Sequence, residues 1–467
     1  MQLTRSGGMH VAPPLLIALE NQIGKKILGG FHLRKKHEKQ AVVLSVAMMC
    51  FLLSGCGGQQ TEKAGKAVQN EPLSISTNPV TLRIALPYNW VQEAEFKQYI
   101  EEPVKKRYPH ISFEIFNLAA KGQTLDELIA ADQIPDLVMT ASPLMERYMG
   151  RGLEENIEPL IKKHGFDLTR LNKTAVDAVK IVSQTDYLTG LPWTMHFYAN
   201  YYNKTIFDKF GVAYPRNGMT WEETYELAKK LTRNEGGVQY RGLEPDGAVR
   251  VSSVLSLGYV DPKTNKASVN TDSWKNVFDL LKKIYEIPGN GEVKLSGNAI
   301  NQFAKDETLA MYPSLNLLSN LKDEKKLNWD IVQYPSFKEL PNTGMQVDEY
   351  ILHITKQSKY KDQAFQVLAT LLSEDVQKEI ARVGRIPTLT GKDIEEEFGK
   401  SLDFTKGKNL KAAFLSQPSK PFPVTKYDAR AKQIILESMN SVVKGAKDIN
   451  TALRESEENI NVYIASQ

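Results

Sequence analysis

The chain has 467 residues, of which 42% are hydrophobic and 24% are charged, with 59 Lys and Arg against 55 Asp and Glu and a formal net charge of +4. This composition excludes a largely disordered or fibrous chain, and the length allows two or three domains, each with its own core. The sequence contains two cysteines, Cys50 and Cys56. Both lie near the N-terminus, which excludes a disulfide scaffold and a cysteine-based zinc or iron–sulfur site.

The N-terminal region has the layout of a secretory signal. Basic residues at 34–39 precede an apolar run at 41–53, and this run is shorter than the about 20 residues of a membrane-spanning helix. The run ends in Leu-Ser-Gly-Cys at Cys56, which resembles the bacterial lipobox, where the cysteine is lipidated and becomes the mature N-terminus. We therefore expect residues 1–55 to be a signal peptide and Cys56 to be lipidated. The alternative is a plain signal peptide with an incidental cysteine.

The predicted signal peptide is long and carries the excess positive charge. Because 33 residues without a strong pattern precede Arg34, we expect translation to begin further along the chain, near Leu28 or Leu33. Residues 1–55 hold seven Lys or Arg and two Asp or Glu, which leaves 52 against 53 in residues 56–467. The mature chain is therefore close to neutral, and nothing in it indicates a nucleic-acid partner.

A polar stretch at 56–79 is expected to be a flexible tether, and the first folded segments follow it. Strands are predicted over residues 82–86, 111–116 and 137–139. Helices are predicted between them, over 91–107 with a kink at Pro103 and from a capping box at Thr124 to Ala131. This β-α-β-α-β order predicts a parallel sheet with right-handed crossovers, in which ligands bind at the carboxyl ends of the strands.

The loop after the first predicted strand carries Tyr88, Asn89 and Trp90. Exposed aromatic and amide groups at the carboxyl end of a strand are candidates for ligand contact. The alternative is that Trp90 covers the core beneath the following helix. The loops at 117–121 and 140–143 are expected at the same edge.

The rest of the chain alternates helices with short strands. Thr220 and Glu223 form a capping box at the start of a helix that reaches about Thr232. Further helices are predicted over residues 271–285, 361–382, 429–444 and 451–464. The pattern indicates an α/β protein with at least two sheets.

The mature chain lacks the common catalytic and metal-binding motifs. Its four histidines stand alone, and no P-loop, G-x-G-x-x-G, G-x-S-x-G or H-E-x-x-H motif occurs. A carboxylate pair for glycoside hydrolysis is defined by its spatial separation, so the sequence leaves that class open. We expect a binding protein with no catalytic residue, no metal and no cofactor.

An aromatic segment carries a family resemblance. Residues 190–204 read Gly-Leu-Pro-Trp-Thr-Met-His-Phe-Tyr-Ala-Asn-Tyr-Tyr-Asn-Lys, and Ile206-Phe207 and Thr-Trp-Glu-Glu at 220–223 follow. This order resembles the signature of family 1 extracellular solute-binding proteins, the maltose-binding-like receptors of ABC importers. Supporting segments lie in order along the rest of the chain, at 134–138, 307–311, 358–377 and 384–387.

The resemblance implies two α/β lobes, each a mostly parallel sheet flanked by helices, joined by hinge strands and closing around a ligand. By this likeness the N-lobe comprises residues 80–196 plus 347–387, and the C-lobe comprises 197–346 plus 388–467. It also implies that the protein binds a carbohydrate, an oligosaccharide, and delivers it to the permease subunits of an ABC importer. Such a receptor is a lipid-anchored monomer on the extracellular face of the bacterial cytoplasmic membrane.

Candidate ligand contacts combine the aromatic segment with the maltose-binding pattern. Sugars present apolar C–H faces ringed by hydroxyls, so Trp193 and Trp90 are candidate stacking platforms, whereas Tyr201 and Tyr202 are expected in the core. By position in the pattern, the ligand contacts fall on His196, Glu244, Asp246 and Asn316. Asp348 is a further candidate, with a solvated acid as its alternative.

The match to the maltose-binding pattern is partial, since Thr140-Ala141-Ser142-Pro143 replaces its Trp-x-x-Asp-Arg. A saccharide other than maltodextrin is therefore expected. Three alternatives stay open: a receptor for a non-sugar solute such as a peptide, polyamine or chelate, a secreted carbohydrate-active enzyme, and a structural or adhesion lipoprotein.

Overall fold

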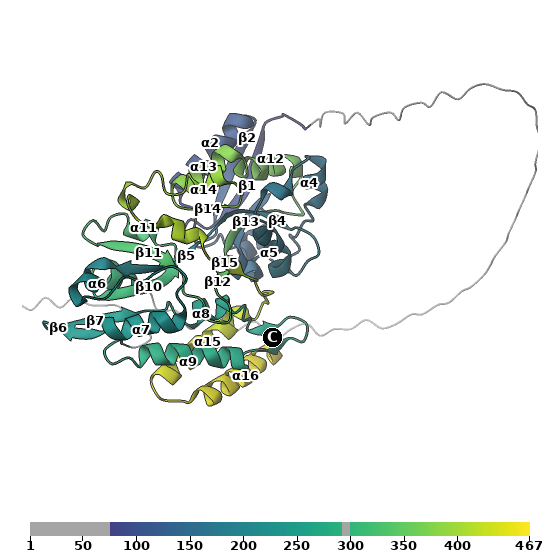
Figure 1. Cartoon of the computed structure of the whole chain (residues 1–467). Helices are drawn as coiled ribbons and strands as arrows, with labels where there is room; N and C mark the ends of the chain where they lie inside the picture. The colour runs from purple at the N-terminus through teal and green to yellow at the C-terminus, as the bar shows by residue number, and fades with distance from the viewer. Residues whose placement is uncertain (1–74, 292–298) are drawn as a thin grey trace, which may run out of the picture. The chain divides into compact units, whose positions relative to one another are not determined.

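The computed structural model describes residues 75–291 and 299–467, which all belong to a single unit (Figure 1). The predicted signal peptide at 1–55 and the predicted lipidation at Cys56 lie outside the described residues. Within those two ranges, no helix combines the length and the apolar character that crossing a membrane requires.

The first lobe is built on a six-stranded sheet with the order β14-β4-β13-β3-β1-β2. Its strands are β1 (Val80–Leu86), β2 (Ile111–Asn117), β3 (Leu137–Ala141), β4 (Gly190–Met195), β13 (Glu349–Ile354) and β14 (Ile386–Pro387). β1 pairs in parallel with both β2 and β3, as the β-α-β-α-β pattern predicts. Strands β1 to β4 point in one direction, whereas β13 and β14 run antiparallel to their neighbours.

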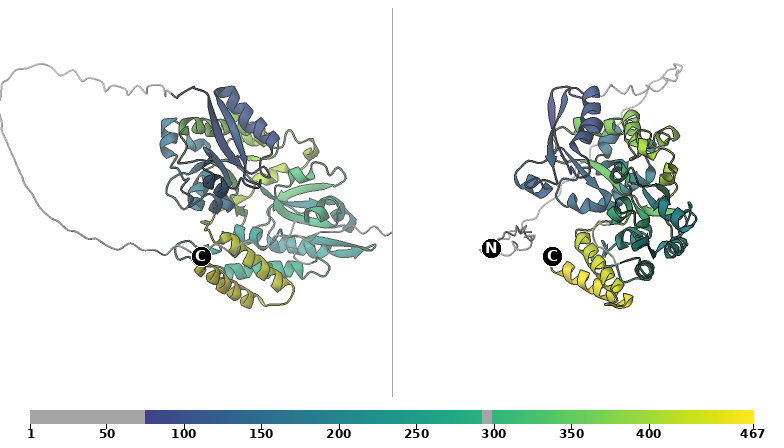
Figure 2. Two further views of the ribbon diagram at one scale, coloured as in Figure 1. Left: turned by 180° about the vertical axis from the view of Figure 1, so that it is seen from behind. Right: turned by 90° about the vertical axis from the view of Figure 1, so that its left-hand side faces the viewer.

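Helices cover the first sheet on both faces (Figure 2). They are α1 (Glu93–Phe96), α2 (Glu102–Arg107), α3 (Leu125–Ala130), α4 (Glu158–Lys163), α5 (Lys173–Ser183), α12 (Lys361–Leu371), α13 (Glu374–Arg382) and α14 (Lys392–Glu395), with the short turns η1 (Lys97–Glu101), η2 (Ser142–Arg147) and η3 (Leu168–Arg170). The predicted capping box is present, because Thr124 Oγ1 accepts from Glu127 N and Glu127 Oε2 accepts from Thr124 N.

Two predicted helices of this lobe are interrupted, each for a local reason. The helix predicted over 91–107 contains the π-helical turn η1 just before Pro103 enters the first turn of α2, since proline lacks an N–H and crowds the preceding turn. The helix predicted over 361–382 is two helices, α12 and α13. Ser373 between them adopts an extended ψ of 153° and begins the second helix.

The second lobe is built on a five-stranded sheet with the order β11-β5-β10-β7-β6. Its strands are β5 (Tyr198–Asn203), β6 (Arg233–Glu235), β7 (Val238–Leu243), β10 (Leu309–Leu315) and β11 (Trp329–Gln333). β7 and β10 are parallel and β11 points the same way, whereas β5 runs antiparallel between β10 and β11. Two small sheets pair β8 (Val260–Asp261) with β9 (Lys266–Ala267) and β12 (Thr343–Gln346) with β15 (Gln417–Ser419).

The helices of the second lobe include the C-terminal pair seen in yellow in Figure 1. They are α6 (Lys204–Phe210), α7 (Trp221–Leu231), α8 (Ala248–Val254), α9 (Asp272–Tyr285), α10 (Ala299–Ala304), α11 (Leu318–Leu321), α15 (Asp428–Val443) and α16 (Ile449–Ala465), with the 3-10 turns η4 (Asp403–Thr405) and η5 (Leu410–Phe414). Helix α7 begins at the predicted Thr220 capping box. The helices expected over 271–285, 429–444 and 451–464 correspond to α9, α15 and α16.

Each sheet has its own hydrophobic core, and a third cluster connects them. The first core gathers around β1, β3 and β13, and the second packs Trp221 and Trp274 of α7 and α9 with the C-terminal helices. The third cluster contains Tyr201 and Trp329 of the second sheet together with Ile386 of β14. Tyr201 is fully buried and Tyr202 nearly so, as expected for structural residues.

The close packing of α7 on β7 at Gly242 yields a prediction. A Cβ at Gly242 would lie 2.6 Å from Ala228 Cα and closer still to the Ala228 carbonyl oxygen. Because helix backbone cannot yield as a side chain can, we expect Gly242→Ala to lower the free energy of unfolding by about 1–3 kcal/mol. Gly258→Ala is the matched control, since its Cβ would lie 3.5 Å from the Phe422 ring. Urea unfolding measures both, and equal midpoints would contradict this packing.

Candidate ligand-binding cleft

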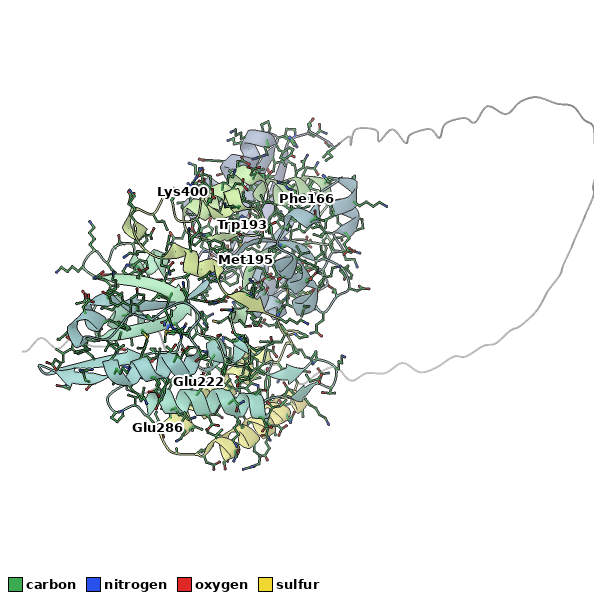
Figure 3. All side chains as sticks on the ribbon, viewed as in Figure 1. Phe166, Trp193, Met195, Glu222, Glu286 and Lys400 are labelled. Atoms are coloured by element: carbon green, nitrogen blue, oxygen red, sulfur yellow. The ribbon has the colours of Figure 1, made fainter. Side chains whose placement is uncertain are left out.

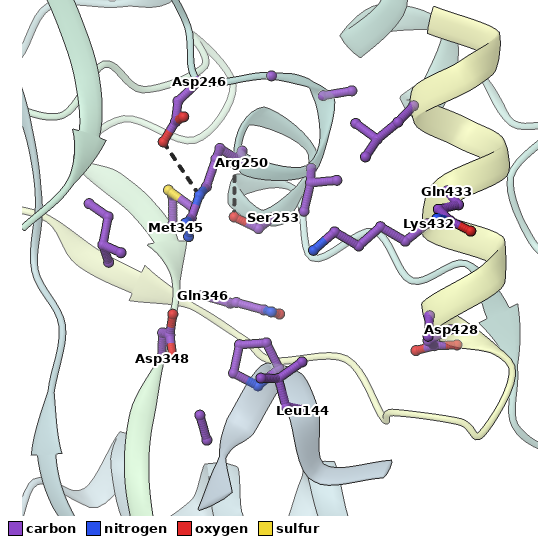
Figure 4. Close-up of a pocket in the computed structure, with 18 of the residues that line it drawn as sticks. Leu144, Asp246, Arg250, Ser253, Met345, Gln346, Asp348, Asp428, Lys432 and Gln433 are labelled. Atoms are coloured by element: carbon purple, nitrogen blue, oxygen red, sulfur yellow. Dashed lines mark hydrogen bonds and ion pairs between the residues drawn. The ribbon is translucent and has the colours of Figure 1, made fainter. Parts of the chain in front are cut away.

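A cavity of about 1050 Å³ is lined by residues of both lobes. The first lobe contributes the loop after β1, the β3–η2 turn and the start of β13. The second lobe contributes β5, the β7–α8 turn, β10 and one face of α15 (Figure 4). The volume lies just above the range of about 300–1,000 Å³ that is typical of small-molecule sites, so the cavity accommodates a ligand larger than a single small ring.

The structure brings six of the nine candidate contacts to this cavity. The six are Asn89, Trp90, His196, Glu244, Asp246 and Asp348. The other three, Tyr88, Trp193 and Asn316, do not line it.

Trp193 lies in the core of the first lobe instead of the cleft (Figure 3). Its side chain is 1% exposed, because β4 lies inside the sheet between β14 and β13 and both of its faces are covered. The expectation that this indole offers a stacking face to a sugar is therefore corrected. Sequence pattern did not distinguish a cleft tryptophan from a core tryptophan on a doubly covered strand.

Tyr88 and Asn316 make hydrogen bonds that connect loop segments to each other. The Tyr88 backbone N–H donates to Asn117 Oδ1 at 3.2 Å, which ties the loop after β1 to the end of β2. Asn316 Nδ2 donates to the Gly384 carbonyl at 2.8 Å, and its Oδ1 accepts from the Leu318 N–H at 3.0 Å. Asn316 therefore joins the end of β10 to the segment before β14.

Trp90 lines the cavity and also packs against the first core, so both of its predicted roles are combined. One face of its ring stacks on Tyr350, with ring centroids 5.4 Å apart and planes 5° apart. The Arg385 guanidinium lies over the same tyrosine, donates to the Trp90 carbonyl at 3.3 Å and pairs with Glu95 at 2.6 Å. These contacts hold the indole in one orientation at the edge of the cavity.

His196 and Asp348 lie where the chain passes between the two sheets. The His196 backbone N–H donates to the Asp348 carbonyl at 2.8 Å, which joins the two crossing segments. Asp348 Oδ2 accepts from the Tyr198 hydroxyl at 3.3 Å. Burial lowers the pKa of His196, and the nearby Asp348 only partly offsets this effect, so the imidazole is neutral at neutral pH.

Glu244 belongs to a buried polar cluster at the second-lobe wall. Its Oε2 pairs with Arg241 Nη2 at 2.7 Å, and its Oε1 accepts from the Tyr285 hydroxyl at 2.5 Å. Arg241 Nη1 also donates to Gln302 Oε1 at 2.5 Å. Burial raises the pKa of Glu244, with Arg241 opposing the shift. Both carboxylate oxygens of Glu244 therefore have protein partners. Glu244 forms part of the cavity wall and has no carboxylate oxygen left without a partner.

Asp246 sits in the turn between β7 and α8 with a positive φ of 58°, a conformation that Asp adopts more readily than most residues. It accepts from the Tyr312 hydroxyl at 3.2 Å and from Ser314 Oγ at 2.8 Å. Arg250 Nε lies 3.5 Å from Oδ2, the oxygen that also accepts from Ser314. The turn thus places a hydrogen-bonded carboxylate and an arginine together on the cavity wall.

Several lining residues were not found by sequence reasoning, among them Arg250, Lys432 and Glu146. The sequence could have indicated Arg250, because it follows Asp246 by four residues at the start of a helix, a spacing that allows an ion pair. Nothing in the sequence indicated Lys432, because only the packing of α15 brings it to the cleft. The residues in the two described ranges include no group of three or more His, Cys, Asp or Glu arranged to hold a metal ion.

The family model for bacterial extracellular solute-binding protein matches residues 89–378. The chain belongs to this family. An ABC substrate-binding protein from Listeria monocytogenes in complex with cycloalternan is 20% identical, with a TM-score of 0.67 over 83% of this chain and 100% of its own. The cyclic α-maltosyl-1,6-maltose binding protein from Arthrobacter globiformis is 14% identical, with a TM-score of 0.65 over 84% and 100%.

A third solved structure, UgpB from Mycobacterium tuberculosis in complex with glycerophosphocholine, is 13% identical to this solute-binding protein. Its TM-score is 0.64, over 83% of this chain and 99% of its own. At these identities the likenesses establish the two-lobed fold. They leave the ligand to be argued from the cavity.

Glu349, next to Asp348, is a buried acid behind the cleft of this solute-binding protein. Its side chain is fully buried, and among the described residues neither carboxyl oxygen has a hydrogen-bond partner. Burial raises the pKa of Glu349 to about 8, which the nearby Ser142 hydroxyl only partly offsets. The carboxyl is therefore mostly protonated at neutral pH in the folded protein.

This shift predicts a pH dependence of stability. Between the ordinary value of 4.5 and about 8 the folded protein keeps the Glu349 proton that the unfolded chain releases. The free energy of unfolding therefore falls as the pH rises through this window, by about 1 kcal/mol per pH unit. Glu349→Gln removes the effect, so its stability relative to the wild type should increase from about pH 5 to about pH 8.

Urea unfolding at several pH values measures this difference. Glu235→Gln, on the exposed strand β6, is the control and should keep a constant offset from the wild type. A constant offset for Glu349→Gln as well would show that Glu349 is ionised in the folded protein.

Proposed function

We propose that this solute-binding protein captures a carbohydrate, an oligosaccharide, between its two lobes and delivers it to an ABC-type importer. The observation that carries the proposal is the Trp90–Tyr350 stack at the edge of a large cavity with polar walls. An aromatic face suits the apolar C–H face of a sugar ring, and surrounding amide, carboxylate and hydroxyl groups suit its hydroxyls. The named ligands cycloalternan and cyclic α-maltosyl-1,6-maltose of two similar structures support a saccharide.

Capture would proceed by closure of one lobe against the other. The moving bodies are residues 80–196 plus 347–387 and residues 197–346 plus 388–467, except that Leu389 and the α14 residue Ile394 pack in the core of the first lobe. The His196–Asp348 crossing would be the hinge. A ligand that contacts both lobes binds the closed form more tightly, so it shifts the population toward that form. The permease subunits of the importer would then recognise the closed form.

The second candidate function is a receptor for a non-sugar solute, which the glycerophosphocholine complex of UgpB favours. Binding is favoured over catalysis, because the cavity carboxylates of Glu244 and Asp246 are held by protein partners. A secreted carbohydrate-active enzyme would instead release shorter products from its ligand, and product analysis by chromatography separates the two classes.

The carbohydrate proposal is tested by a thermal-shift screen over neutral and acidic oligosaccharides, followed by calorimetry of any ligand found. A ligand at about 100 times its Kd stabilises the folded state by about 2.7 kcal/mol. Trp90→Ala should weaken binding by about tenfold or more, because it removes the stacking face. Tyr108→Ala, at the amino end of β2, removes a half-buried ring away from the cavity and should leave Kd unchanged. Absence of any shift across the screen would refute a carbohydrate ligand.

We further propose that the protein is a lipid-anchored monomer on the extracellular face of the bacterial cytoplasmic membrane. The signal-like leader and the lipobox-like sequence ending at Cys56 support this placement. Cys56→Ala should move the protein from the membrane fraction to the medium or to an unprocessed form, as seen by immunoblot. Its affinity for ligand in solution should be unchanged, and a loss of binding in the purified variant would contradict a role limited to tethering.

A further inference from the structure

Charged side chains of both signs line the cavity. Five acidic and five basic side chains line it. Most of them are matched within the protein: Arg241 pairs with Glu244 at 2.7 Å, and Asp428 accepts from Thr425 Oγ1 at 2.6 Å. Arg147 is 68% exposed at the rim and lies 3.8 Å from Glu146, and Arg430 donates to Gln433 at 3.2 Å. The two remaining cations, Lys432 and Arg250, have unused donors.

Lys432 is the first of these cations. It extends from α15 into the cavity (Figure 4). Among the described residues its ammonium group has no carboxylate within 4.0 Å and no hydrogen-bond partner. Burial lowers the pKa of Lys432, and the positive charge of Arg250 adds to this shift. The lysine side chain is exposed to the open cavity that Arg250 also lines.

Arg250 is the second. Its Nε lies 3.5 Å from Asp246, an acid whose oxygens already accept from Tyr312 and Ser314. Within the described ranges no hydrogen bond is made by its two terminal nitrogens. A guanidinium with a free edge and a nearby ammonium form an arrangement suited to a carboxylate or a phosphate group.

Two acidic residues of the first lobe, Glu146 and Asp348, lie near Lys432. Glu146 is largely buried on η2, and burial raises its pKa. Asp348 accepts from Tyr198. Neither lies within 4.0 Å of Lys432 in this structure. Closing the lobes on a neutral ligand would exclude water and leave Lys432 and Arg250 repelling each other, whereas an anionic group between them is attracted by both.

We propose that the ligand is a saccharide bearing an anionic substituent, a carboxylate or a phosphate, which Lys432 and Arg250 bind while Trp90 contacts a sugar ring. This proposal rests on the carbohydrate function proposed above and narrows its ligand class. Lys432 is then the specificity-determining residue, and neutral saccharides of the same size bind more weakly.

The test compares ligands matched except for charge, by calorimetry with the purified protein. One arm uses oligogalacturonate against its methyl ester, and the other uses maltose 6′-phosphate against maltose, which separates a carboxylate from a phosphate. In the arm that suits the natural ligand, the acidic form should bind about tenfold more tightly or better, with an affinity that falls as salt is added.

Variants of Lys432 assign the preference to this residue. Lys432→Gln should lose most of the preference while binding the neutral form as the wild type does, and Lys432→Arg should retain it. Lys444→Gln, an exposed lysine at the end of the same helix, is the matched control and should behave as the wild type. Thermal unfolding of each variant establishes that it is folded.

The outcomes separate the two proposals. Tighter binding of the neutral forms, or an equal loss for neutral and acidic forms in Lys432→Gln, overturns the anionic ligand but leaves the carbohydrate function standing. An equal loss for neutral and acidic forms would mean that Lys432 forms an ion pair with Glu146 or Asp348 when the lobes close. Absence of binding to every saccharide in the screen, neutral or acidic, counts against the carbohydrate function itself.

Discussion

One backbone hydrogen bond, from the His196 N–H to the Asp348 carbonyl, joins the two segments where the chain passes between the sheets. It extends the antiparallel ladder of β4 and β13 to the point where the chain leaves the first sheet and enters β5 of the second. The cavity forms around this point, with His196, Tyr198, Asp348 and Tyr350 all within a few residues of it. If the lobes move relative to each other as proposed, the chain bends here, and the proposed hinge then lies beside the residues that line the cavity.

At the start of β13, successive side chains point to opposite sides of the strand. Asp348 turns to the cavity, whereas Glu349 is directed into the protein, where burial keeps it protonated. Tyr350 then supports Trp90 from beneath. One end of β13 therefore supplies both Asp348 for hydrogen bonding and Tyr350 for stacking. The residue between them, Glu349, is buried without a hydrogen-bond partner among the described residues.

In the second lobe, some charged side chains are paired within the protein and others face the cavity. Arg241 and Glu244 neutralise each other inside the wall, and Asp246 is held by two hydroxyl groups. Lys432 and Arg250 are left facing the cavity. Together with Trp90 they are the basis of the proposed ligand, which combines an apolar face with a negative group and is a narrower class than the family alone indicates.

Local signals in the sequence determined the parallel order of β1 to β3, the capping boxes at Thr124 and Thr220, and the candidate residues in loops at the carboxyl ends of strands. These follow from periodicity and chain connectivity, which act over a few residues. Tertiary structure alone decided that Trp193 is core, because burial of a strand on both faces depends on its neighbours in the sheet. It also decided that Lys432, more than 180 residues after Arg250 in the chain, shares a cavity with it, since helix packing has no local sequence signal.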